Sequence, residues 1–175
     1  MNLSFKQNFF ELFGLPARFA LDAAGLERSY RRIQSQIHPD KFAHASEADR
    51  RASMQWTARV NEAYQTLKAP LARAAYLLAL QGTDPGFESN TSMSPEFLLA
   101  QMGWREAVEE ASLAGDARQL DSLSLSLRGE IDRLYAEIGR ELDGNHAAAA
   151  ETLRKLKFLE KVREEIDAAL ERLEA

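Results

Sequence analysis

The stretch that decides the fold of this chain is Tyr30-Arg-Arg-Ile-Gln-Ser-Gln-Ile-His-Pro-Asp-Lys-Phe42. Apolar residues at helical spacing run into it on one face: Leu26, Tyr30, Ile33 and Ile37. Pro39 has no N–H and disfavours helical backbone at the residue before it, so the helix is predicted to end there. His38, Pro39 and Asp40 are therefore expected at the tip of a loop, with their side chains held out to solvent.

Three interpretations of this tip are open from the stretch alone. Pro39 could be a plain helix stop, with His38 as a C-terminal cation that suits the helix dipole. A metal site is a second possibility because His38, Asp40 and His44 are close in sequence, although the chain has no HExxH pair and no cysteine. The third interpretation is a tip that docks on a partner protein.

The residues after the tip favour docking. Ser46 and Asp49 have the spacing of a capping box, with Asp in place of the usual Glu. A second helix is predicted to follow, with one apolar face made by Ala52, Trp56, Val60, Tyr64 and Leu67. Two amphipathic helices joined by a short loop are expected to form an antiparallel hairpin. A basic helix, an exposed His-Pro-Asp tip and a longer second helix resemble the J-domain of J-domain co-chaperones.

Other signals complete the first half of the chain. An apolar cluster at residues 9–15 predicts a brief helix packed across the hairpin, and Asp22 is a good N-cap for the basic helix. Pro70 and Gly82 bracket a further predicted helix. Residues 1–82 are therefore predicted to form the J-domain with a trailing helix. The polar, turn-rich residues 83–94 are expected to be a linker.

The second half predicts an antiparallel three-helix bundle over residues 95–175, which makes the whole protein all-α. Ser94 and Pro95 begin the first bundle helix, Gly115 ends it and Asp116 caps the next. The second helix has an apolar stripe at Leu120, Leu123, Leu127, Ile131, Leu134, Ile138 and Leu142. The third has one at Leu153, Leu156, Leu159, Val162, Ile166, Leu170 and Leu173.

The first bundle helix carries two stripes where packing needs one. Phe97, Trp104, Val108 and Ala111 form the predicted core stripe, and a second set comprises Leu98, Leu99, Met102, Glu106 and Glu110. The second set is either the edge of a wide buried face or an exposed apolar patch rimmed by carboxylates, which is typical of protein-docking sites. Phe158 lies off the core face of the last helix, so it is a candidate anchor or a residue packed at the bundle edge.

Composition and charge exclude several functional classes. The chain is 45% hydrophobic and 28% charged, as in ordinary soluble globular proteins. Its net charge of −5 divides into +2 for residues 1–94 and −7 for residues 95–175. A nucleic-acid-binding protein normally has a basic domain, so no nucleic-acid partner is expected. The asymmetry instead indicates two different protein partners.

The absence of cysteine rules out disulfides and cysteine-ligated zinc or iron–sulfur sites. There is no apolar run of membrane-spanning length and no signal-peptide pattern at the start, so a cytoplasmic protein without membrane contact is expected. The chain has three histidines but no glycine-rich phosphate loop and no obvious catalytic pair. We therefore expect no catalytic residue, no cofactor, no metal site and no enzymatic activity.

Four segments carry a further resemblance: Phe10-Glu-Leu-Phe-Gly-Leu-Pro-Ala-Arg-Phe19, His38-Pro-Asp-Lys-Phe42, Tyr76-Leu-Leu78 and Arg154-Lys-Leu-Lys-Phe-Leu-Glu-Lys161. Together they are similar to the HscB family, the dedicated J-proteins of bacterial iron–sulfur cluster assembly. The resemblance runs from about Phe9 to the C-terminus. It implies that the J-domain stimulates the ATPase of HscA, a DnaK-type chaperone, and that the bundle binds the scaffold protein IscU.

The resemblance also implies site residues. The scaffold-binding set matches Leu98, Leu99, Met102, Glu106, Glu110 and Phe158, and the expected chaperone-binding set is His38, Pro39, Asp40, Arg28, Arg31, Arg32 and Lys41. One position departs from the family, which can have an acid where this chain has Gly103. Eukaryotic relatives often carry a cysteine-rich zinc module, so a chain without cysteine resembles the bacterial form.

The alternative function is a general J-domain co-chaperone that delivers unfolded clients. Such proteins usually add glycine-rich or cysteine-rich regions, and neither is present in this sequence. A compact acidic bundle suits a folded client better.

Overall fold

The computed structural model describes residues 4–86 and 93–174, and every regular element in these ranges is helical. The contacts divide the chain into two compact units, Met1–Leu77 and Leu78–Ala175. The prediction of an all-α protein is confirmed, as is the order of a helical hairpin followed by a bundle. The predicted linker 83–94 lies partly outside the described residues, so its limits stay a prediction.

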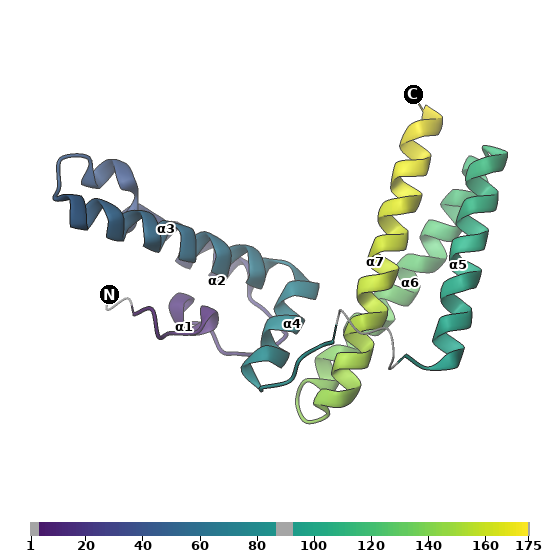
Figure 1. The fold of residues 1–175 in the computed structure, drawn as a ribbon, viewed down its shortest axis with the longest axis horizontal. Helices are drawn as coiled ribbons and strands as arrows, with labels where there is room; N and C mark the ends of the chain where they lie inside the picture. The colour runs from purple at the N-terminus through teal and green to yellow at the C-terminus, as the bar shows by residue number, and fades with distance from the viewer. Residues whose placement is uncertain (1–3, 87–92, 175) are drawn as a thin grey trace. The chain divides into compact units, whose positions relative to one another are not determined.

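The first unit is built on a hairpin of two long helices (Figure 1). Helix α2 spans Ala23–Ile37 and α3 spans Glu47–Lys68, joined through a short 3-10 helix, η1, at Pro39–Phe42. The Asp22 carboxylate accepts a hydrogen bond from the Gly25 N–H at 2.9 Å, which confirms the predicted N-cap. The hairpin interior is apolar and fully buried at Leu26, Ile33, Val60, Ala63 and Leu67.

Two shorter helices pack beside the hairpin. Helix α1 spans Phe9–Phe13 and α4 spans Pro70–Leu80. The ring of Phe9 stacks on Tyr76 with centroids 4.4 Å apart, and the Phe9 N–H donates to the Tyr76 hydroxyl at 3.0 Å. The predicted brief helix at residues 9–15 is therefore present and contributes Phe10, Leu12 and Phe13 to the core.

One residue of the predicted α3 face is wrong. Ala52 is exposed, and Ser53 is buried in its place with 4% of its surface accessible. The physical reason is that the Ser53 hydroxyl donates to the Ile37 carbonyl at 2.5 Å, so a polar side chain has a partner at the end of α2. Apolar spacing alone does not reveal such a position.

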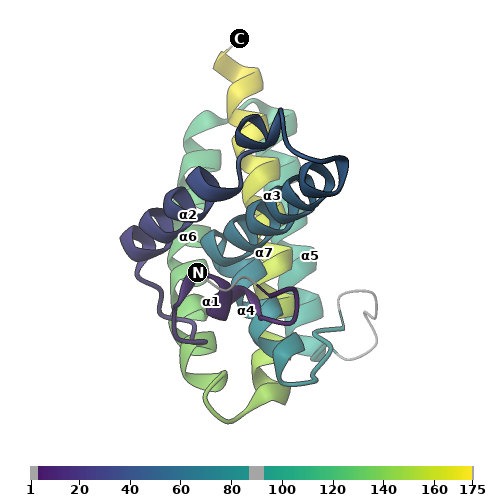
Figure 2. The same ribbon diagram turned by 90° about the vertical axis from the view of Figure 1, so that its left-hand side faces the viewer.

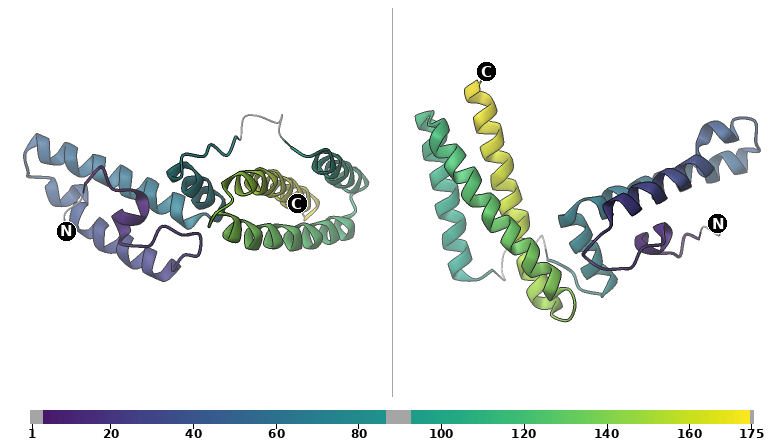
Figure 3. Two further views of the ribbon diagram at one scale, coloured as in Figure 1. Left: turned by 90° about the horizontal axis from the view of Figure 1, so that it is seen from below. Right: turned by 180° about the vertical axis from the view of Figure 1, so that it is seen from behind.

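The second unit contains the predicted bundle. Helix α5 spans Pro95–Ala114, α6 spans Ala117–Glu141 and α7 spans His146–Glu174, and successive helices run antiparallel (Figures 2 and 3). Gly115 ends α5 with a φ of +63°, a left-handed conformation that suits glycine, and the Asp116 carboxylate accepts from the Gln119 N–H at 3.0 Å. Helices α6 and α7 pack together more extensively than either packs on α5.

The core of the bundle comes mainly from α6 and α7. Their predicted stripes are buried along most of their length, but Leu173 was wrongly placed in the core, because it is 44% exposed in the last turn of α7. The fully buried residues of α5 are Val108 and Ala111, both in its second half. The first half of α5 therefore leaves a broad surface uncovered by the other two helices.

Candidate functional site

The His38-Pro39-Asp40 tip lies at the surface, as predicted. The side chains of His38 and Asp40 are 52% and 90% exposed. The tip is more ordered than a simple loop, because Pro39 begins η1 and His38 is its N-cap. The His38 Nδ1 accepts a hydrogen bond from the Asp40 N–H at 3.3 Å and lies 3.5 Å from the Asp40 Oδ2. The tip therefore presents a carboxylate in a conformation fixed by its own short helix.

Helix α3 contacts the end of α2 next to the tip. The buried Ser53 hydroxyl bonds the last carbonyl of α2, one residue before His38. The Ser46 hydroxyl accepts from the Asp49 N–H at 3.1 Å, so the predicted N-cap is correct. The capping box differs from prediction, because the Ser46 hydroxyl itself donates to the Asp49 carboxylate at 2.6 Å.

The basic side of α2 is exposed but partly paired within its own helix. Arg31 lies 2.6 Å from the Glu27 carboxylate and Arg28 lies 3.5 Å from the Asp22 carboxylate. Arg32 and Lys41 are exposed and make no ion pair within the part of the chain that the structure describes. All four cations remain close to solvent, so any of them can meet a charged partner surface.

Glu27 links the basic helix to α3. Its carboxylate accepts a hydrogen bond from the Tyr64 hydroxyl as well as from Arg31. The Tyr64 hydrogen bond, with Arg31 next in importance, lowers the pKa of Glu27 below its ordinary 4.5. The same hydrogen bond raises the pKa of the Tyr64 phenol. Glu27 is therefore ionised at neutral pH and joins the two helices at the end of the hairpin away from the tip.

The second stripe of α5 forms an exposed apolar patch. Leu98 is 41% exposed, Leu99 is 70% exposed and Met102 is 59% exposed. Glu106 and Glu110 continue the stripe toward the C-terminus and are also exposed. Of the two sequence-based interpretations, the wide buried face is therefore wrong, and the structure has an open apolar surface edged by acids. Adjacent exposed apolar side chains of this kind mark protein-interaction surfaces.

Phe158 sits at the edge of this patch, half-buried between α7 and α5. Its ring meets Phe97 edge-on with centroids 5.8 Å apart, and the Arg105 guanidinium lies over it at 5.6 Å. The ring thus packs at the bundle edge while keeping part of its surface open. The structure brings Phe158 to α5, where Leu98 and Met102 lie, although the residues are far apart in sequence.

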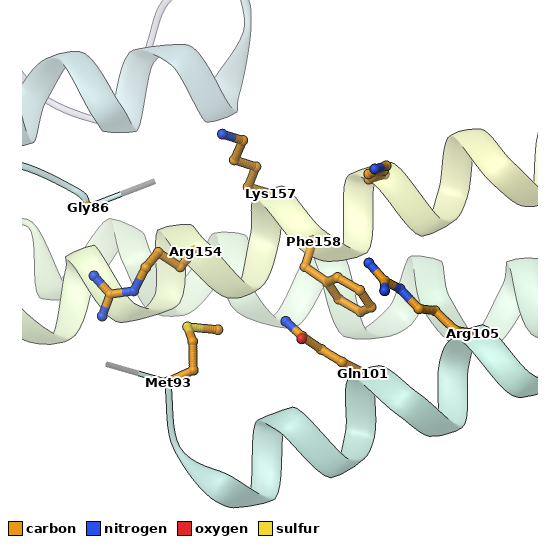
Figure 4. Close-up of a pocket in the computed structure, with 8 residues that line it drawn as sticks. Gly86, Met93, Gln101, Arg105, Arg154, Lys157 and Phe158 are labelled. Carbon is orange, nitrogen blue, oxygen red and sulfur yellow. The ribbon is translucent and has the colours of Figure 1, made fainter. Parts of the chain in front are cut away.

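A pocket of about 180 Å³ opens beside Phe158, and sequence reasoning missed it. Its lining residues are Gly86, Met93, Gln101, Arg105, Arg154, Lys157, Phe158 and Lys161. In Figure 4 the side chains come from both α5 and α7, with Gln101 and Arg105 on either side of the phenyl ring and Arg154 near Met93 in the chain that precedes α5. The signal available in the sequence was the density of cations in Arg154–Lys161.

Two further observations concern the described residues. No group of three or more His, Asp or Glu side chains within 4–86 and 93–174 is arranged to hold a metal ion, so His38, Asp40 and His44 are not assembled as a metal site. In the same ranges, none of the helices combines the length and the apolar character needed to cross a membrane.

Comparison with known proteins places these features in a family. Residues 93–167 match the family model described as HSCB C-terminal oligomerisation domain. The chain is 51% identical over 176 residues to the Co-chaperone protein HscB homolog of Aromatoleum aromaticum, covering 99% of both chains. It is 52% identical over 173 residues to the protein of the same name from Burkholderia thailandensis, covering 98% of this chain and 99% of the relative.

Solved structures agree over both units. Chaperone HscB from Vibrio cholerae is 40% identical, with a TM-score of 0.86 over 95% of this chain and 99% of that one. The human co-chaperone protein HscB is 25% identical, with a TM-score of 0.90 over 95% of this chain and 83% of that one.

Proposed function

This chain belongs to the HscB family of co-chaperones, and we propose that it stimulates the ATPase of a DnaK-type chaperone, HscA, and delivers the iron–sulfur scaffold protein IscU to it. The observation that carries the proposal is a molecule with two exposed contact surfaces, one on each compact unit. The first is the His38-Pro39-Asp40 tip with its basic helix. The second is the apolar patch of α5 with Phe158.

The tip acts by docking and catalyses no reaction itself. Asp40 carries an exposed carboxylate that can accept a charge-assisted hydrogen bond from an arginine of the chaperone. The cations Arg28, Arg31, Arg32 and Lys41 would meet acidic groups on that partner, mainly speeding and orienting the encounter. Docking then favours the chaperone state that hydrolyses ATP and traps its client, which is a shift between existing states.

The bundle holds the client. Leu98, Leu99 and Met102 offer apolar area that is already exposed, so binding removes it from water without local unfolding. Phe158 is the aromatic anchor, because it is large and only half covered. Glu106 and Glu110 supply the acidic edge. Gly103 stands where the family can have an acid, so this edge lacks one possible carboxylate.

Steady-state ATPase measurements with HscA and IscU test the proposal. Asp40→Asn is expected to fold as the wild type and bind IscU normally, yet fail to raise the ATPase rate. Full stimulation by this variant would exclude the tip from the mechanism. A cytoplasmic location, where both proposed partners act, fits this role.

The patch is tested by calorimetric titration of IscU into the double variant Leu99→Ala with Phe158→Ala. Truncating two interface residues that include an aromatic anchor is expected to weaken IscU binding by about 2 kcal/mol or more, roughly thirtyfold in Kd. Unchanged affinity for the scaffold would show that the patch has been assigned to the wrong surface.

A further inference from the structure

The cationic pocket beside Phe158 adjoins the apolar patch. On α5, Leu98, Met102 and Arg105 are spaced at i, i+4 and i+7, so the patch and the pocket wall are neighbours on one helix face. Phe158 lines the pocket and also contacts α5. A partner that covers the patch therefore also reaches the mouth of the pocket.

The charge of the pocket is opposite to that of the bundle around it. Four of its lining residues are cations, Arg105, Arg154, Lys157 and Lys161, and none is an acid. Residues 95–175 carry a net charge of −7. A concentration of positive charge within an acidic unit attracts an anionic group while the surrounding surface repels one, which makes the site selective.

Two other cations of α7 are paired with carboxylates on the same helix. Lys155 lies 2.7 Å from the Glu151 carboxylate and Arg163 lies 2.5 Å from that of Glu160. By contrast, Arg105, Arg154 and Lys161 make no ion pair with any carboxylate in residues 4–86 and 93–174. These three cations are therefore available to an outside acid.

Arg154 is also pre-positioned for such a group. One terminal nitrogen, Nη1, donates to the Pro85 carbonyl at 2.9 Å, which fixes the guanidinium. Its Nε is buried and has no hydrogen-bond acceptor among the described residues. Arg154 also lines the pocket, so an incoming carboxylate would meet the part of its side chain that faces the pocket and not the buried Nε.

We propose that this pocket receives a carboxylate side chain of the scaffold protein, an inference that rests on the proposed function. The pocket, at about 180 Å³, is smaller than the roughly 300–1,000 Å³ of small-molecule sites, so it fits a protein side chain better than a cofactor. The partner surface is then apolar in the centre, acidic where it meets α7 and basic where it meets Glu106 and Glu110. Opposite charges on the two edges fix its orientation.

Charge reversal in the full-length protein tests the pocket. In the double variant Arg105→Gln with Lys161→Glu, Arg154 and its bond to Pro85 are left in place. The matched control is Arg118→Gln with Arg128→Glu, which makes the same change in net charge at exposed positions of α6. Circular dichroism and thermal unfolding establish that all variants fold, and calorimetric titration with IscU gives Kd at low and high salt.

The pocket variant is expected to bind about tenfold more weakly and to lose most of the salt dependence, whereas the control changes by less than about twofold. A scaffold variant with one Asp→Lys or Glu→Lys substitution is expected to bind the pocket variant of this chain more tightly than it binds the wild-type chain. Equal losses in both double variants, or none in the pocket variant, would overturn the inference.

The binding results distinguish a failure of the pocket inference from a failure of the proposed function. If Leu99→Ala weakens binding and the pocket variant does not, the pocket inference alone fails. If the wild type does not bind the scaffold at all, both fail. A second copy of this chain is the other possible occupant of the pocket, and sedimentation of the protein without a partner tests for it. Self-association that is lost in the pocket variant would assign the pocket to a second copy and overturn the proposal.

Discussion

Single side chains around the tip show what a pattern can and cannot predict. The exposure of His38 and Asp40 followed from Pro39, because proline stops a helix through its own covalent structure. The 3-10 helix at Pro39–Phe42 did not follow, since proline favours a helix start as well as a helix stop. Ser53 was missed because its burial depends on a carbonyl sixteen residues away in sequence.

Ser53→Ala tests that buried hydrogen bond. The substitution leaves the Ile37 carbonyl without its partner in a buried site, which is expected to lower the free energy of unfolding by about 1–3 kcal/mol. Urea denaturation measures the change. Ser35→Ala is the matched control, because its hydroxyl also donates to a backbone carbonyl, of Arg32, but is exposed, and a loss below about 0.5 kcal/mol is expected. Equal losses would show that burial is irrelevant.

Glu27 gives the hairpin a pH dependence of known sign. Its pKa is lowered in the folded protein, so the unfolded chain takes up a proton first as the pH falls. The stabilisation by the Glu27 carboxylate is present above its ordinary pKa of 4.5 and is lost as the pH falls from there through the folded value.

Glu27→Gln should therefore be less stable than the wild type at pH 7, with a difference that shrinks below pH 4.5. Thermal unfolding from pH 7 to pH 3 measures the difference. A constant difference across this range would mean that the carboxylate charge contributes nothing.

At the level of helices, the caps and the core stripes could be predicted because their signals are local in the sequence. Asp22, Ser46, Ser94 and Asp116 all cap the helices that their positions predict. Leu173 kept the spacing of a core residue but lies in the last turn of α7, where it stays partly exposed. The pocket could not be predicted, because its walls come from two helices and the chain before α5, which only packing brings together.

Two glycines of the bundle test how α5 is built. Gly103 lies in the middle of α5, and an added Cβ would meet no atom within 4 Å, so Gly103→Ala is expected to raise the free energy of unfolding by about 0.5–1 kcal/mol. Gly115 has a φ of +63°, so Gly115→Ala is expected to lower it by about 1–2 kcal/mol. Denaturant unfolding distinguishes the two. Stabilisation by both substitutions would contradict the helix end seen at Gly115.

The two proposed contact surfaces of the molecule lie on different compact units, and each surface is formed by residues of its own unit. The tip is held by α2 and α3 in the first unit, and the patch by α5 and α7 in the second. The opposite net charges of the two halves of the sequence, +2 and −7, fit two partners of different character. Mutations in separate units without shared contacts usually act independently.

The two activities should therefore be separable. Asp40→Asn is expected to abolish stimulation of the chaperone ATPase and leave the Kd for the scaffold within about twofold, because Asp40 and the bundle belong to different compact units. Leu99→Ala with Met102→Ala is expected to weaken scaffold binding about tenfold or more while basal stimulation, measured without scaffold, is unchanged. Calorimetry and ATPase assays on both variants measure this. If either variant lost both activities while remaining folded, the two units would have to act as one surface, and the model of two independent contacts would be wrong.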